Sequence, residues 1–186
     1  MNLQKLFEAQ AELDAFIEQQ HPTQEGENRL EKKVLALLVE LSECAQESRC
    51  FKFWSNDQEP RNYCKNCAMT ETPHECKNPL LEEYVDCLHF ILSIGNEIKI
   101  SNVHAINYSS SSQKFTQNVI TIHFALIYNV TTDLMFSQGE FKELNYRVLL
   151  AHFELLGEML GFSAKQIEEA YWKKYEINKQ RQRDGY

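Results

Sequence analysis

Glycine and proline are scarce in this chain of 186 residues, with six and four copies respectively. So small a share argues against a disordered chain, a collagen-like chain and a β-protein with many tight turns. Long apolar runs are also missing, since no uninterrupted stretch approaches the roughly 20 residues that span a bilayer. Positive charge is in the minority, with 19 Lys and Arg against 27 Asp and Glu. We therefore expect no membrane partner and no general binding to nucleic acid.

The length and the N-terminal residues indicate how many domains to expect and in which compartment. A chain of this size is large enough for one domain with a real core, which we expect to cover residues 1–186. The first residues, MNLQKLFEAQAELDAF, form an amphipathic pattern and not a signal peptide. We therefore expect a cytoplasmic protein, whose six cysteines are reduced or metal-bound and not paired in disulfides.

Apolar residues recur at helical spacing through most of the chain. The segment 119–130, VITIHFALIYNV, is ambiguous because its β-branched residues favour a strand, but its length and helical surroundings favour a helix. The expected fold class is all-α, a helical bundle with two loop insertions, a cysteine-rich one at 55–79 and another at 99–118. Helices are predicted over residues 2–20, about 28–50, about 80–99, 140–160, and from a capping box at 163–166 to the C-terminus.

Two pairs of acidic residues stand at helical spacing. Glu40 and Glu43 lie in the second predicted helix, and Glu83 and Asp86 in the third, which is apolar nearly all round. A single such pair usually faces solvent. Unpaired carboxylates are costly to bury, however, so four of them converging across two helices would need a cation. Hard oxygen ligands of this kind suit Mg²⁺.

The charge is unevenly distributed along the chain. Residues 171–186 hold five Lys or Arg and two Asp or Glu, whereas the rest is acidic. Such a tail can bind an anion beside a cation held by the acidic body. Composition alone favours the simpler interpretation, a solvated final helix.

Three sequence stretches resemble the all-α, dimeric dUTPase (dUTP diphosphatase) family, a branch of the MazG-like nucleoside triphosphate pyrophosphohydrolases. They are ELSECAQESRCFKFW (40–54), LEEYVDCLHFILSIG (81–95) and AYWKKYEINKQRQRDGY (170–186). The resemblance extends from Leu6 to the C-terminus, apart from the loops near 55–79 and 99–118. It implies a homodimer with residues of both subunits near each site. The implied reaction is hydrolysis of dUTP to dUMP and pyrophosphate with two or three Mg²⁺ ions.

The same resemblance implies a role for each matching residue. Glu40, Glu43, Glu83 and Asp86 would bind Mg²⁺, and Glu40 would also orient or deprotonate the attacking water. The implied substrate contacts are Gln10 and Trp54 around the uracil, His89 at the deoxyribose, Lys174, Asn178, Arg181 and Tyr186 at the phosphates and base, and Arg49 and Lys52 as further phosphate contacts.

Two departures from the family pattern leave alternatives open. Tyr175 stands where the C-terminal motif has Asn, and Gln46 where the family often has Asn. Because of Tyr175, a related enzyme that prefers dCTP, or a broader (d)NTP pyrophosphatase, is the alternative. A regulatory binding module is a second one, against which the four retained carboxylates argue.

The loop at 55–79 carries a possible second metal site. Its C-x2-C-x6-H-x-C pattern could close a structural Zn²⁺ site, although a loop with free thiols or a redox-sensitive C-x-x-C fits as well. Cys44, Cys50 and Cys87 lie in or beside predicted helices and are expected in the core. The candidate zinc ligands are Cys64, Cys67, His74 and Cys76.

Overall fold

The structure is a computed structural model that describes residues 1–63, 77–100 and 115–185. Within these ranges the chain forms α-helices and no strand, which confirms the all-α fold class. The ambiguous segment 119–130 is helical, as predicted, and belongs to α4. The helices are α1 (Leu3–Gln20), α2 (Arg29–Ser48), α3 (Pro79–Glu97), α4 (Gln117–Phe136), α5 (Gly139–Met159) and α6 (Ala164–Arg183).

Side-chain caps define where most of these helices begin. The cap side chain accepts a hydrogen bond from a backbone N–H of the first turn, a donor that lacks a partner within the helix. The predicted capping box of α6 is present, with Ser163 and Gln166 bonded reciprocally. Similar caps open α1 to α4, at Asn2, Asn28, Asn78 and Thr116.

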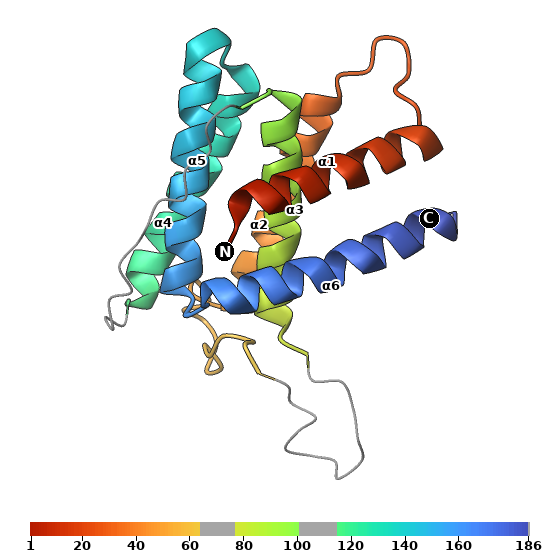
Figure 1. The fold of residues 1–186 in the computed structure, drawn as a ribbon. Coiled ribbons are helices and arrows are strands. Elements are labelled where there is room, and N and C mark those ends of the chain that lie inside the picture. The colour runs from red at the N-terminus through yellow and green to blue at the C-terminus, as the bar shows by residue number, and fades with distance from the viewer. Residues whose placement is uncertain (64–76, 101–114, 186) are drawn as a thin grey trace, which may run out of the picture.

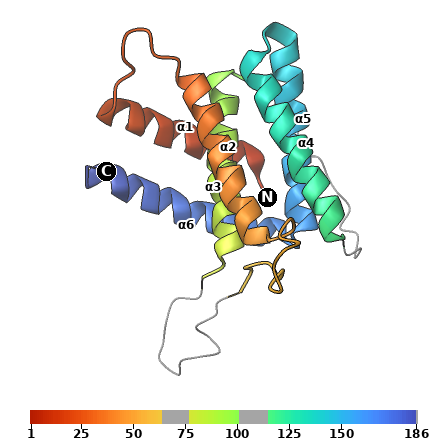
Figure 2. The ribbon, with the colours of Figure 1, turned by 180° about the vertical axis from the view of Figure 1, so that it is seen from behind.

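Helix α3 lies at the centre of the molecule. It runs antiparallel to α2, while α4 and α5 form a second antiparallel pair beside them (Figures 1 and 2). Helices α1 and α6 lie side by side and cross α3, and their far ends project beyond it (Figure 1). Helix α3 contacts α1, α2, α5 and α6, which explains why it is apolar nearly all round.

Close packing fixes α5 against α3. The Tyr84 ring stacks on Phe153 with centroids 4.3 Å apart, and its hydroxyl donates to the Phe153 carbonyl at 3.0 Å. The same hydroxyl lies against Gly157, where an added Cβ would stand 2.5 Å from it. The absence of a side chain at Gly157 therefore lets α5 approach α3.

The chain reverses direction directly after α2. Arg49 has a left-handed backbone, with φ of 57°, and ends the helix. The chain then comes back to the end of α2, where the Arg61 amide donates to the Glu47 carbonyl at 2.9 Å. The Leu80 amide donates in turn to the Arg61 carbonyl at 3.0 Å. Residues 55–63 and 77–78 of the predicted 55–79 loop are thus non-helical and anchored at the α2 terminus, whereas Pro79 already begins α3. Residues 64–76 of this loop, and residues 101–114 of the predicted 99–118 insertion, lie outside the described part of the chain.

Helix α4 has an unusual composition for a surface helix. Among the described helices it is the one long and apolar enough to cross a membrane by length and composition, although core helices of soluble proteins pass the same test. About a third of this stretch is buried inside the structure. The sequence-based expectation of no membrane partner therefore stays a prediction.

Candidate active site

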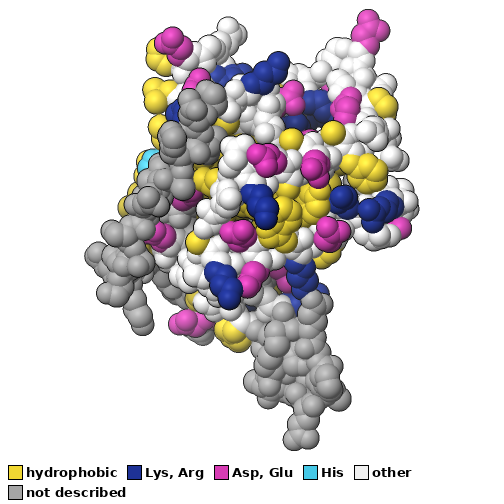
Figure 3. Space-filling view, viewed as in Figure 1, with side chains coloured by type: hydrophobic (Ala, Val, Ile, Leu, Met, Phe, Trp, Pro, Cys, Tyr) yellow, Lys and Arg dark blue, Asp and Glu magenta, His cyan; other side chains and the backbone are white. Residues whose placement is uncertain are grey.

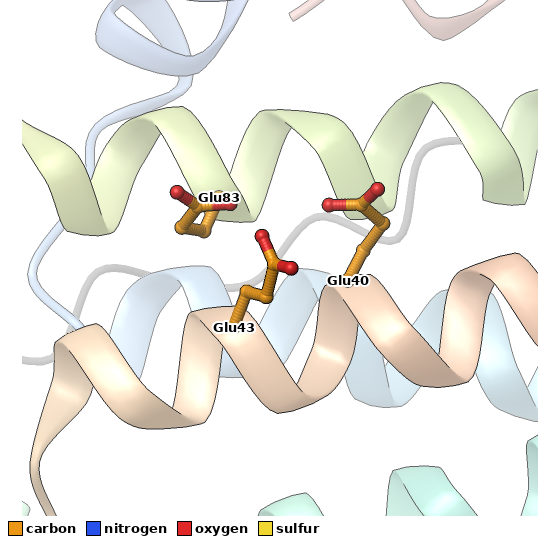
Figure 4. Close-up of side chains that lie close together, drawn as sticks. All are labelled: Glu40, Glu43 and Glu83. Carbon is orange, nitrogen blue, oxygen red and sulfur yellow. The ribbon is translucent and has the colours of Figure 1, made fainter.

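Three glutamates from α2 and α3 converge at one point. Glu40 and Glu43 stand one turn apart on α2, and Glu83 faces them from α3 (Figure 4). One carboxylate oxygen of each lies within 4.8 Å of those of the other two. The i, i+3 spacing and the antiparallel packing of α2 against α3 produce this glutamate cluster, as the sequence predicted.

The fourth predicted acid, Asp86, is engaged differently. It stands one turn after Glu83 on α3, but its Oδ2 accepts a hydrogen bond from the Lys174 ammonium at 2.5 Å. Both side chains are largely buried. Asp86 is therefore next to the cluster and electrostatically coupled to it, but it is paired with a cation of the protein.

Burial and mutual repulsion disfavour ionisation of these acids. Burial first, and then the charges of Asp86 and Glu43, raise the pKa of Glu40 to about 7. The pKa of Glu83 is also raised to about 7, by burial and then by Asp86, Glu43 and Glu40. Burial raises the pKa of Asp86 too, against the opposing effect of Lys174. A divalent cation would offset both the cost of burying these carboxylates and their mutual repulsion. A donor set made only of carboxylates fits Mg²⁺.

A pocket of about 640 Å³ adjoins the cluster, between α1, α2, α3 and α6. Lys174, Asn178 and Arg181 follow one another at helical spacing, so that one face of α6 presents them to it. Acidic and basic side chains alternate over the face of the molecule that α1 and α6 form (Figure 3). Of the predicted site residues, the pocket brings together Gln10, Glu40, Asp86, His89, Lys174, Asn178 and Arg181.

Three other predicted contacts lie away from this pocket. The Arg49 guanidinium is bound to the Asp57 carbonyl at 2.8 Å, which holds the turn after α2. The Lys52 ammonium lies 5.5 Å from the centre of the Phe51 ring. Trp54 is 65 % exposed and packs edge-on against its neighbouring aromatic rings. None of the three lines the pocket of its own chain.

The remaining predictions fall outside the described residues or in the core. Tyr186 and the candidate zinc ligands Cys64, Cys67, His74 and Cys76 are not among the described residues, so their roles stay predictions. Cys44, Cys50 and Cys87 are buried and unpaired, as expected. Tyr175, the departure from the family motif, is buried and donates to Glu12 at 3.3 Å. It does not line the pocket.

Sequence reasoning missed a polar network at the α1 side of the pocket. The Gln10 amide donates to Asp14 at 2.8 Å, and its oxygen lies 2.7 Å from Nδ1 of His89. Ser93 donates to the other oxygen of Asp14 at 2.7 Å. Asp14 follows Gln10 by one helical turn, and this i, i+4 spacing was the available signal.

The fold and the site place the chain in a class of all-α proteins with a carboxylate cluster beside a pocket that both acidic and basic side chains line. The comparison with protein families makes this specific, because the family model described as dUTPase matches residues 2–67 and 69–186. The chain therefore belongs to the all-α dimeric dUTPase family, and this membership supports hydrolysis of dUTP to dUMP and pyrophosphate as its enzymatic activity. No curated protein matches the chain significantly.

Proposed function

We propose that this pocket hydrolyses dUTP in a Mg²⁺-dependent reaction, with the triphosphate between the glutamate cluster and α6. The observation that carries the proposal is the meeting of two opposite charge sets in one pocket. Glu40 and Asp86 line it from α2 and α3, and Lys174 and Arg181 line it from α6. A metal–triphosphate complex carries both signs of charge, and such a pocket complements both.

The residues present fit a bound Mg²⁺. Glu40, Glu43 and Glu83 would hold it, and Asp86 would join them when Lys174 moves to the substrate. When bound, the ion would neutralise phosphate charge and activate water for attack. The raised pKa values of Glu40 and Glu83 support this assignment, because a cation there removes a cost that the protein alone bears.

Glu40 is the residue to which we assign the attacking water. Of the three glutamates in the cluster, it is the one that lines the pocket. Its carboxylate can accept a proton from water and orient it toward the substrate. Glu43 and Glu83 would then serve as metal ligands alone.

The α6 side chains would stabilise the polyphosphate. Lys174 provides an ammonium, and Arg181 a planar guanidinium that can form two hydrogen bonds to phosphate oxygens. Asn178 lies between them in sequence and offers an amide that can pair with either phosphate or base. In this proposal the positive charge of residues 171–186 binds the polyphosphate, a function that composition alone could not assign.

Pyrophosphate release from a panel of dNTPs and UTP tests the proposal. We expect dUTP to be hydrolysed far faster than the others with Mg²⁺, and no reaction in EDTA. Glu43→Gln should abolish turnover while leaving the protein folded. Equal rates for all nucleotides, or a preference for dCTP, would contradict the assignment of dUTP. Activity that persists in EDTA would contradict the assignment of the metal.

We propose that the chain is a homodimer and that the surface formed by α2 and α4 is its interface. Leu35 and Val39 of α2 are 59 % and 50 % exposed, and Ile122 and Leu126 of α4 are 63 % and 45 % exposed. The two helices pack together, and Asp133 is the one charged residue of α4. Exposed apolar side chains on two helices that pack together can be covered by the same side chains of a second copy, despite the net charge of −8.

Mass measurement in solution tests the interface. The native protein should have twice the mass of the chain, and Ile122→Glu should yield folded monomer. Phe141→Glu, at an exposed position of α5, is the matched control and should leave the dimer intact. A monomeric native protein, or a dimer that survives Ile122→Glu, would contradict the proposal. Trp54, Arg49 and Lys52 do not line the pocket of their own chain, and we propose that in the dimer they contribute to the pocket of the other chain.

A further inference from the structure

Helices α1 and α6 lie side by side and run in the same direction (Figure 1). Near their N-terminal ends the Asn2 amide donates to the Glu168 carboxylate at 3.3 Å. About one turn further along, the Tyr171 hydroxyl donates to the Leu6 carbonyl at 3.3 Å. The first halves of the two helices are thus joined, whereas their C-terminal halves project beyond α3 and line the pocket.

Tyr175 forms the last side-chain hydrogen bond between α1 and α6, two helices that the structure describes along their whole length. The Tyr175 ring is buried, and its hydroxyl lies 3.3 Å from Glu12 and 3.4 Å from the Lys179 ammonium. An ammonium can only donate, so the hydroxyl accepts from Lys179 and gives its own hydrogen to Glu12. We call these three residues the α1–α6 clasp.

Two pocket-lining side chains of α6 come after the clasp in the chain. Asn178 follows Tyr175 by about one turn and Arg181 by nearly two turns, in the half of the helix that projects. A projecting helix end has few contacts of its own, so its direction is sensitive to the last contact before it. Lys174 differs from both, because Asp86 on α3 binds its ammonium directly.

We propose that Tyr175 is a positioning residue, which holds the projecting half of α6 so that Arg181 is directed at the substrate polyphosphate. This inference rests on the proposed function, since it places the phosphates beside α6. Tyr175 does not line the pocket and therefore acts through Arg181 and not on the base. The tyrosine at this departure from the family motif thus has a role in phosphate binding in this chain.

Steady-state kinetics of clasp variants test the proposal. Tyr175→Phe, which keeps the ring, should raise the KM for dUTP roughly fivefold and leave kcat within about twofold of native, because an arginine that is no longer held must be ordered on binding. Glu12→Ala, an exposed change, should act in the same way, and Glu12→Gln, which can still accept from Tyr175, should keep the native KM. A native KM in both Tyr175→Phe and Glu12→Ala would overturn the proposal.

Double variants test whether Tyr175 acts through Arg181. In an Arg181→Ala background, Tyr175→Phe should cause no further loss of kcat/KM. In a Lys174→Met background it should cause the same loss as in the native protein, because Lys174 is held from α3. An equal further loss in both backgrounds would contradict the proposal. So would a Tyr175→Phe enzyme whose preference for dUTP over dCTP is altered, since Tyr175 would then act on the base.

Tyr146→Phe is the matched control for the loss of a tyrosine hydroxyl. The Tyr146 hydroxyl is buried between α5 and α3, where it donates to the Ile91 carbonyl at 3.0 Å, and Tyr146 does not line the pocket. The control should therefore lower the Tm and leave the KM for dUTP unchanged. If it raises the KM as much as Tyr175→Phe does, the effect reflects general stability and the proposal is wrong.

Hydrogen exchange tests the clasp without any measurement of activity. The backbone amides of residues 176–180 should exchange faster in Tyr175→Phe and Glu12→Ala than in the native protein, while the amides of α2 should exchange at the native rate. Native exchange rates at 176–180 in both variants would overturn the proposal. Failure of the native protein to hydrolyse any nucleotide would count against the proposed function, and the exchange rates would still decide whether Tyr175 holds the end of α6.

Discussion

The ammonium of Lys174 donates to Oδ2 of Asp86 at 2.5 Å, and this ion pair joins the basic face of α6 to the acidic cluster of α2 and α3. Both partners are largely buried, so neither charge is well solvated if the other leaves. Binding of a cation beside Asp86 and of an anion beside Lys174 would each compete for one partner. The two ligands of the reaction are therefore expected to bind cooperatively, each releasing the residue that the other requires.

Replacing Lys174 separates its pairing with Asp86 from its binding of the substrate phosphates. Lys174→Met should lower kcat/KM for dUTP about 100-fold, because the developing charge on the phosphates loses a fixed cation. It should also strengthen binding of Mg²⁺ to the substrate-free protein, because Asp86 is no longer paired. Steady-state kinetics and calorimetric titration with Mg²⁺ measure the two effects. Lys173→Met, one residue earlier and exposed, is the control. Equal losses in both variants would show that general charge, and not the ion pair, matters.

The stability of the metal-free protein should fall as the pH rises from about 6.5 to 8. Glu40 and Glu83 have a pKa of about 7 in the folded protein against an ordinary value of 4.5, so the folded state binds more protons than the unfolded state in this range. Deprotonation therefore favours unfolding. The lowered pKa of His89 has the opposite effect, but this effect fades as the pH rises past 6.5, and the two glutamates outweigh it here.

Thermal unfolding in EDTA over this pH range measures the effect. The Tm of the native protein should decrease toward pH 8, and the Tm of Glu83→Gln should decrease less over the same range. Saturating Mg²⁺ should remove most of the pH dependence of the native Tm. A Tm that rises between pH 6.5 and 8 in EDTA would mean that the glutamates are ionised at lower pH than the geometry implies.

Gly157→Ala should destabilise the fold by roughly 1–3 kcal/mol, the usual cost of overpacking a tight core. The added methyl would stand 2.5 Å from the buried Tyr84 hydroxyl, which cannot move without losing its bond to Phe153. Urea unfolding of the single variant, of Tyr84→Phe and of the double variant gives the coupling between the two positions. We expect the double variant to be less destabilised than the sum of the two single ones. Simple additivity would mean that α5 shifts away instead.

The sequence predicted the helices well because each carries its own local signals. Asn28 and Ser163 are N-caps followed by an apolar stripe, and the near-absence of a polar face on α3 marked it as central. The convergence of Glu40 and Glu83 was also predictable, since i, i+3 spacing on two antiparallel neighbours leaves few arrangements.

The positions of Trp54 and Asp14 could not be predicted in this way. The direction of the chain after α2 depends on the left-handed backbone of Arg49, which no local rule for arginine implies. The role of Asp14 depends on contacts with Gln10 and Ser93 across two helices, which exist only once α1 packs on α3. From the sequence alone, Asp14 cannot be distinguished from an ordinary acidic residue that faces solvent.

The most direct test of the account compares two adjacent glutamates of α3. Glu83 belongs to the glutamate cluster, whereas Glu82, exposed on the same turn, does not. Pyrophosphate release from dUTP at saturating Mg²⁺ should fall at least 100-fold in Glu83→Gln and stay within about twofold of native in Glu82→Gln. Full activity in a folded Glu83→Gln protein, or equal loss in both variants, would contradict the claim that this cluster holds the catalytic metal.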